Sequence, residues 1–162
     1  MKKIIYLLGI LTLFPTTNYS QDISLKGKEL FGGMQARHIG PALMSGRIID
    51  VENHPTNPRI IYLGAAGGGV WKSSDTGTTF SPIFDDYAQS IGVVKLDPKH
   101  PDEIIWVGTG EIWTRNSVSV GDGLFKSTDG GSNWIKVGFE NSERISSIVI
   151  NPDNTDEMYV GV

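Results

Sequence analysis

Short hydrophobic runs alternate with polar turns along the chain from about residue 46 to its last residue. Runs of four to six residues bounded by glycine, proline, asparagine or aspartate are typical of strands. Beyond the first twenty residues, no stretch has the periodicity of a helix. We therefore expect an all-β chain with strands at residues 48–53, 60–65, 69–73, 80–84, 91–96, 104–108, 123–127, 134–137, 145–150 and 158–162.

The strand pattern repeats along the chain. A polar turn follows the first strand of each unit, at Pro55, Pro98 and Pro152, and the next strand carries an aromatic residue and a glycine. These prolines are 43 and 54 residues apart, and one longer loop in the second unit accounts for nearly all of the difference. Four short strands in about 40 to 50 residues are typical of a β-propeller blade. We expect about two and a half four-stranded blades, near 46–85, 90–138 and, truncated, 144–162.

Two and a half blades cannot close a ring, because a propeller needs about four to eight blades to cover the faces that each blade exposes. We therefore expect this chain to be the N-terminal part of a longer propeller whose remaining blades pack against it. The alternative is a free-standing stack of sheets or a self-assembling fragment.

The first twenty residues have the pattern of a secretory signal peptide. Lys2 and Lys3 precede an apolar run of eleven residues, 4–14, which is shorter than the roughly 20 residues that a membrane-spanning helix needs. We expect cleavage after Ser20, a lead-in segment at 21–45, and a secreted, periplasmic or cell-surface protein with no membrane anchor after cleavage. An uncleaved anchor is the alternative.

Composition narrows the range of functions. The chain has 14 Lys and Arg against 18 Asp and Glu, for a net charge of −4, which argues against a nucleic-acid partner. It has no cysteine, so a disulfide framework and thiolate zinc sites are excluded. Its three histidines are too scattered for a metal site, and we expect neither a metal nor another cofactor.

A Ser-x-Asp-x-Gly-x-x-aromatic block occurs twice, 54 residues apart. The Asp carboxylate can accept hydrogen bonds from backbone N–H groups of a tight turn, and the glycine permits a positive φ. We expect a structural role for both blocks. Their residues are Ser73, Asp75, Gly77 and Phe80, and Ser127, Asp129, Gly131 and Trp134.

These two blocks resemble the Asp-box (BNR) repeat of sialidases, sortilins and xyloglucanase-type glycoside hydrolases. The wider pattern, at residues 39–41, 45–47 and 67–72, is similar to the start of large secreted bacterial proteins with a sortilin-type propeller, which are often labelled glycosyl hydrolases. The resemblance covers about residues 37–162. It implies that the Asp boxes lie opposite the ligand-binding mouth.

Two sets of residues are candidates for ligand binding. The repeat register places Arg47 and Arg144 at the starts of innermost strands, where guanidinium groups suit carboxylates or other anions. The inserted loop contributes the second set, since long loops on rigid repeats often bind ligands; its candidates are Glu111, Trp113, Arg115 and Asp122. The alternatives are arginines paired with acidic neighbours such as Glu143 and a loop that plugs the channel.

The expected function is ligand or protein binding in the manner of sortilin-type domains, with a peptide, protein or carbohydrate as partner. The alternative is a glycoside hydrolase on the same propeller, and a structural or assembly role is a third. A glycosidase needs two carboxylates roughly 5 to 10 Å apart. In xyloglucanase-type enzymes a catalytic Asp precedes the glycines after the second strand, but the matching stretch here, 64–69, has no carboxylate. The catalytic residues are unknown, and some or all would lie in the remaining blades.

Overall fold

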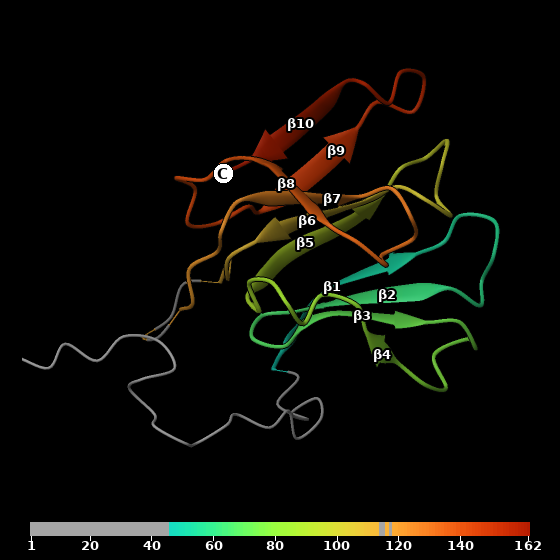
Figure 1. Ribbon diagram of the computed structural model, residues 1–162, viewed down its shortest axis with the longest axis horizontal. Helices are drawn as coiled ribbons and strands as arrows, with labels where there is room; N and C mark the ends of the chain where they lie inside the picture. The colour runs from blue at the N-terminus through green and yellow to red at the C-terminus, as the bar shows by residue number, and fades with distance from the viewer. Residues whose placement is uncertain (1–45, 114–115, 117) are drawn as a thin grey trace, which may run out of the picture. The chain divides into compact units, whose positions relative to one another are not determined.

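The computed structural model describes residues 46–113, 116 and 118–162. The predicted signal peptide and lead-in segment therefore lie outside the described residues. Within these residues the chain forms three antiparallel sheets and no helix (Figure 1). The first sheet comprises β1 (Ile48–Asn53), β2 (Ile61–Ala65), β3 (Gly69–Ser73) and β4 (Ser81–Pro82). The second comprises β5 (Ile91–Leu96), β6 (Ile105–Thr109), β7 (Leu124–Ser127) and β8 (Ile135–Gly138), and the third β9 (Ser147–Ile150) and β10 (Met158–Gly161).

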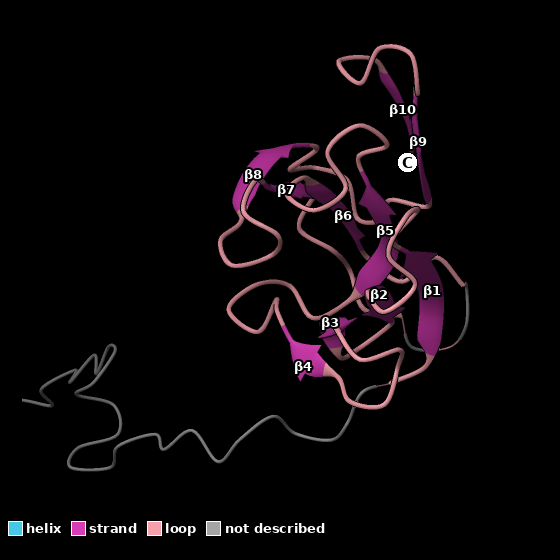
Figure 2. Ribbon diagram, turned by 90° about the vertical axis from the view of Figure 1, so that its right-hand side faces the viewer, coloured by secondary structure: helices cyan, strands magenta, loops and turns pink. Residues whose placement is uncertain are grey.

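Each of the two complete sheets is a meander in which successive strands are neighbours. The innermost strands β1, β5 and β9 run along one side of the stack, with β1 against β5 and β5 against β9, while β4 and β8 lie at the other side (Figure 2). This is the radial arrangement that a propeller requires. The strands agree with the predicted ranges to within one or two residues at each end, except for the fourth.

The first and second sheets are equivalent in register. Trp71 on β3 pairs with Leu63, and Phe125 on β7 pairs with Val107, at the same place in each sheet. Both innermost strands also carry a β-bulge at the same point, between Ile48 and Asp50 in β1 and at the matching residues of β5. The predicted repeat is therefore present as a structural repeat.

The prediction for the fourth strand, 80–84, was wrong in extent, because β4 contains only Ser81 and Pro82. Proline has no N–H to donate to a ladder, and Phe84 turns away into the core between the first two sheets. There its ring packs edge-on against Phe125 and Trp134, with centroids 5.2 and 5.0 Å apart.

The hydrophobic core lies between the sheets. The larger cluster joins the first and second sheets through the following buried side chains: Tyr62, Val70, Phe84, Ile91, Val94, Leu96, Ile105, Val107, Phe125 and Trp134. A smaller cluster joins the second sheet to the third and contains Val93, Leu124, Ile145, Ile148 and Ile150. Packing between neighbouring sheets thus fixes where the inter-strand loops emerge.

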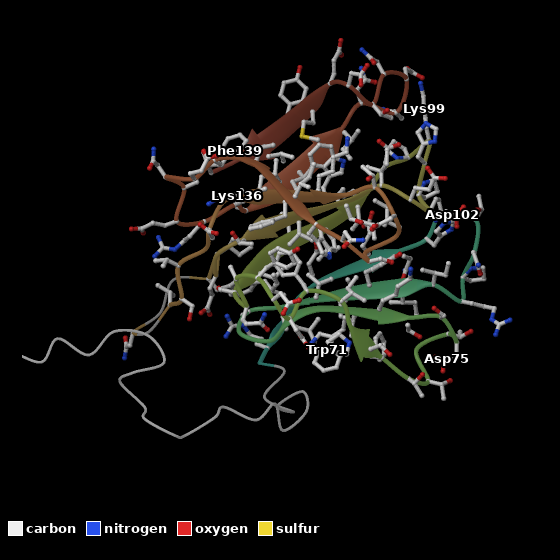
Figure 3. The ribbon with its side chains drawn as sticks, viewed as in Figure 1. Trp71, Asp75, Lys99, Asp102, Lys136 and Phe139 are labelled. Atoms are coloured by element: carbon white, nitrogen blue, oxygen red, sulfur yellow. The ribbon has the colours of Figure 1, made fainter. Side chains whose placement is uncertain are left out.

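The turn after each innermost strand is built around one hydrogen-bond acceptor at the residue before proline. In the first unit His54 Nδ1 accepts from the N–H groups of Thr56 and Asn57, at 3.3 and 3.0 Å. Asp97 Oδ1 occupies the same place in the second unit, and Asn151 Oδ1 does so in the third. These turns and the first Ser-x-Asp turn lie at the same end of the sheets, where Lys99, Asp102 and Asp75 are labelled (Figure 3).

Candidate ligand-binding face

The opposite end of the sheets holds those predicted ligand-binding residues that the structure describes. Here the innermost strands begin and the β2–β3 and β6–β7 loops emerge, at the left of Figure 1. We call this end the loop face and define it by Arg47, Ala66–Gly68, Ser90, residues 110–113 and 118–123, and residues 143–146.

Equivalent backbone hydrogen bonds confirm the register on which the arginine prediction depends. The Ala66 N–H donates to the carbonyl of Arg47 at 2.9 Å, and the Gly110 N–H donates to the carbonyl of Ser90 at 2.7 Å. Arg47 and Ser90 therefore hold the same position in successive sheets, just before the innermost strand.

The guanidinium of Arg47 is paired with the carboxylate of Glu111 through Nη2 and Oε1. Glu111 is only 1% exposed, and a carboxylate so deeply buried is costly unless a cation compensates it. The pair joins the start of the first sheet to the inserted loop of the second. It follows that two predicted ligand-binding residues balance each other's charge.

The inserted loop is fastened to both neighbouring units. The Ser90 hydroxyl donates to the carbonyl of Ser119 at 3.1 Å, within the second unit. The Gly121 N–H donates to the carbonyl of Glu143 at 2.8 Å, at the start of the third. Together with the Arg47–Glu111 pair, these bonds tie the loop to all three units, so the face is built on a fixed frame.

Thr109 closes the base of this loop and is not among the residues predicted from the sequence. Its buried hydroxyl donates to the carbonyl of Gly123 at 2.7 Å and accepts from the N–H of Asp122 at 2.7 Å. The matching residue of the first unit is Ala65. The presence of threonine instead of alanine, directly before the insertion, is the sequence feature that could have identified Thr109. The carboxylate of Asp122 points outward and pairs with Lys136 Nζ at 2.6 Å.

Trp113 is an exposed aromatic side chain of the loop face. It is 65% exposed and follows Glu111, the residue that pairs with Arg47, by two positions. Arg115, the remaining loop candidate, lies outside the described residues. No cluster of three or more potential metal ligands occurs in the part of the chain that the structure describes.

Arg144 has a different environment from Arg47. The nearest carboxylate is that of the exposed Glu143, with Nη2 and Oε2 3.9 Å apart. The buried Nε has no hydrogen-bond partner among the described residues. The predicted pairing with Glu143 is thus present only as a long contact between exposed groups, which stabilises little.

The two Ser-x-Asp turns engage their carboxylates internally. Asp75 accepts from the N–H and hydroxyl of Thr79 and from the hydroxyl of Ser73, at 2.9, 2.7 and 2.8 Å. Asp129 makes the matching bonds to Asn133 and Ser127. Hydrogen bonds from residues 79 and 73 in the first turn, and from 133 and 127 in the second, lower the pKa of each Asp from 3.8 to about 2. Among the remaining block residues, Gly77 and Gly131 have positive φ, and the indole N–H of Trp134 donates to the carbonyl of Ile83 at 2.8 Å.

A polar groove of about 490 Å³ lies between the loop after β4 and the second Ser-x-Asp turn. Its polar lining includes Lys72, Asp85, Asp86 and Asn133. It includes none of the predicted ligand-binding residues. Burial lowers the pKa of Lys72, whose ammonium donates to the carbonyl of Gly130 at 2.9 Å and so bridges the first two sheets.

Comparison with known proteins gives one consistent set of relatives. The chain is 32% identical over 125 residues to a xyloglucanase of Acetivibrio thermocellus and 30% identical over 122 residues to a xyloglucanase of a Paenibacillus species. The chain resembles xyloglucanases. These alignments cover 64% and 65% of this chain, which spans only 13% and 11% of the length of those relatives. No protein-family model matches the chain.

A solved structure supports the fold. The crystal structure of an ancestral GH74 enzyme matches 71% of this chain and 16% of that enzyme, with a TM-score of 0.57 and 21% sequence identity. The predicted all-β propeller fold is therefore confirmed. Within the described residues there is no helix that is long and apolar enough to cross a membrane.

Proposed function

We propose that this chain supplies part of the carbohydrate-binding face of a secreted β-propeller. The observation that carries the proposal is Trp113, an exposed indole on a loop that is tied to three successive units. A flat aromatic ring can stack on the apolar C–H face of a sugar, and a ring on a rigid support loses little entropy on binding. The similarity to xyloglucanases favours a polysaccharide over a protein ligand.

Glycoside hydrolysis is the second candidate function, and the named activity of the relatives favours it. The loop face supplies no ready pair of catalytic carboxylates among its described residues, because Glu111 is paired with Arg47 and Asp122 with Lys136. The stretch 64–69 also lacks a carboxylate. If the protein hydrolyses a glycoside, we expect residues beyond the described loop face to supply at least one catalytic group.

The proposal has two further parts, which concern the Ser-x-Asp turns and the N-terminal segment. We interpret both Ser-x-Asp turns as Asp boxes with a structural role, since their carboxylates are engaged within the turns. We interpret residues 1–20 as a signal peptide, which places the protein outside the cytoplasm. A polysaccharide ligand fits that location, because such polymers are encountered outside the cell.

The test is binding of the intact protein to a panel of plant polysaccharides that includes xyloglucan. We expect Trp113→Ala to weaken binding by about tenfold or more, as the loss of a central aromatic anchor does. Ile135→Ala is the matched control, because Ile135 is also exposed but lies on the outer strand β8. Isothermal titration calorimetry would measure both.

Equal affinity of the Trp113→Ala variant and the wild type would contradict the proposal. Retention by an immobilised peptide library, without binding to any polysaccharide, would instead favour the sortilin-like alternative. Hydrolysis products formed from a bound polymer would show that the protein is also an enzyme and would leave the role of Trp113 in binding intact.

A further inference from the structure

The two arginines of the loop face differ in how their charge is compensated. The Arg47 guanidinium pairs with the buried carboxylate of Glu111. Within the described residues, the side chain of Arg144 makes no hydrogen bond, and its one ion pair is the 3.9 Å contact with exposed Glu143. The side chain of Arg144 is 39% exposed, so its terminal nitrogens can be reached from solvent. The loop face therefore presents one guanidinium whose donors are available.

The backbone that carries Arg144 is held firmly. The next residue, Ile145, is fully buried, and its N–H donates to the carbonyl of Thr109 at 2.9 Å. On the other side, the carbonyl of Glu143 accepts from Gly121 in the inserted loop. Arg144 thus stands on the same frame as the loop that carries Trp113. A rigid support of this kind favours a specific ligand contact.

The other carboxylates of this face already have cationic partners. Arg47 compensates Glu111, and Lys136 compensates Asp122 at 2.6 Å. An anionic ligand that binds the Arg144 guanidinium would therefore compete only with the carboxylate of the exposed Glu143 among the described residues of this face. The planar guanidinium forms paired hydrogen bonds with a carboxylate, and such charge-assisted bonds are stronger than those to neutral hydroxyl groups.

We infer that the polysaccharide bound at the loop face is acidic, an inference that rests on the proposed function. Arg144 binds the carboxylate of a uronic acid residue, while Trp113 stacks on a sugar ring of the same chain. This assigns a charged ligand to a propeller whose named relatives act on xyloglucan.

The experiment compares acidic polysaccharides with the same polymers after reduction of their carboxyl groups to alcohols. Polygalacturonate and polyglucuronate, each with its reduced form, are titrated into the intact protein. We expect the wild type to bind the better acidic polymer about tenfold more tightly than its reduced form. Arg144→Gln should bring the two affinities to within about twofold. Arg144→Lys should keep part of the preference, because lysine retains the positive charge but lacks the paired N–H donors of the guanidinium.

Arg59→Gln is the matched control. It also removes one positive charge, but Arg59 is exposed in the turn between β1 and β2, at the opposite end of the sheets, so the preference for the acidic polymer should persist. Thermal unfolding of each variant shows whether it is folded.

The inference is overturned if the wild type does not distinguish acidic from reduced polymers, or if Arg144→Gln retains the preference. If Trp113→Ala loses all polymers while Arg144→Gln loses none, the ligand is a neutral polysaccharide and only the proposed function stands. If the wild type binds no polysaccharide of any kind, both are rejected.

Discussion

A single backbone position distinguishes the two Ser-x-Asp turns. The residue after the aspartate has a positive φ in both, 63° at Thr76 and 70° at Gly130. The left-handed region costs a residue with a Cβ about 1–2 kcal/mol, whereas glycine enters it freely but loses more conformational entropy on folding. The first turn is thus strained at a position where the second is relaxed.

We predict that Thr76→Gly stabilises the protein by about 0.5–1 kcal/mol, the difference between the relief of strain and the entropic cost of glycine. The reverse change, Gly130→Thr, should destabilise it by a similar or larger amount. Urea unfolding of the intact protein measures both.

Thr78→Gly is the control in the same turn. Thr78 is not among the residues with positive φ, and its hydroxyl donates to the carbonyl of Asp75 at 2.9 Å. This change should therefore destabilise the protein. A stabilising effect at both positions would mean that φ strain at Thr76 is not the cause.

At the scale of the element, each Ser-x-Asp turn depends on an ionised carboxylate. The hydrogen bonds described above lower the pKa of Asp75 and Asp129 from 3.8 to about 2. The folded pKa lies below the unfolded one, so each turn contributes its full stabilisation above about pH 4 and loses it as the pH falls toward 2.

We predict that Asp129→Asn is less stable than the wild type at neutral pH but loses less of its stability between pH 4 and pH 2. The amide has no charge to neutralise and only one acceptor oxygen for the bonds to Asn133. Thermal unfolding midpoints across this pH range measure the effect. The control is Asp86→Asn, which removes an exposed carboxylate from the loop after β4 and should leave the stability at neutral pH nearly unchanged. A pH profile of Asp129→Asn equal to that of the wild type would contradict the assignment.

The sequence predicted elements better than contacts because strand signals are local. Alternating runs and the recurring proline turns located nearly all the strands, while β4 was misjudged because Phe84, read as the end of a strand, is a core residue. The pairing of Arg47 with Glu111 joins residues 64 positions apart. No local sequence pattern predicts such a contact. The two residues were therefore predicted to bind ligand independently and not to form an ion pair with each other. The exposure of Trp113 could be predicted from its place in the insertion.

At the scale of the whole molecule, the contact between the first and second sheets differs in polarity from the contact between the second and third. We call these two contacts the first and second seams. Side chains of β1 cap the inner edge of β5: Asp50 Oδ2 accepts from the N–H of Val94 at 2.8 Å, and Glu52 Oε1 accepts from the N–H of Leu96 at 3.2 Å. Between the second and third sheets, Val93 takes the place of Asp50 in the repeat and packs against apolar residues of β9. The first seam is therefore polar along the inner edge, and the second is apolar.

This difference predicts that Asp50 adds a measurable polar contribution to the packing of the first two sheets, beside their hydrophobic core. Asp50→Ala leaves the Val94 N–H without its partner in a partly buried seam, so we expect a loss of about 1–3 kcal/mol in the free energy of unfolding. Ser147→Ala, at the matching position of the third sheet, is the control and should change stability by less than about 0.5 kcal/mol, because Ser147 is exposed. Denaturant unfolding of the intact protein measures both, and amide hydrogen exchange at Val94 should accelerate in Asp50→Ala because its N–H is no longer protected. Equal effects of the two substitutions, with unchanged exchange at Val94, would show that apolar packing alone joins these sheets.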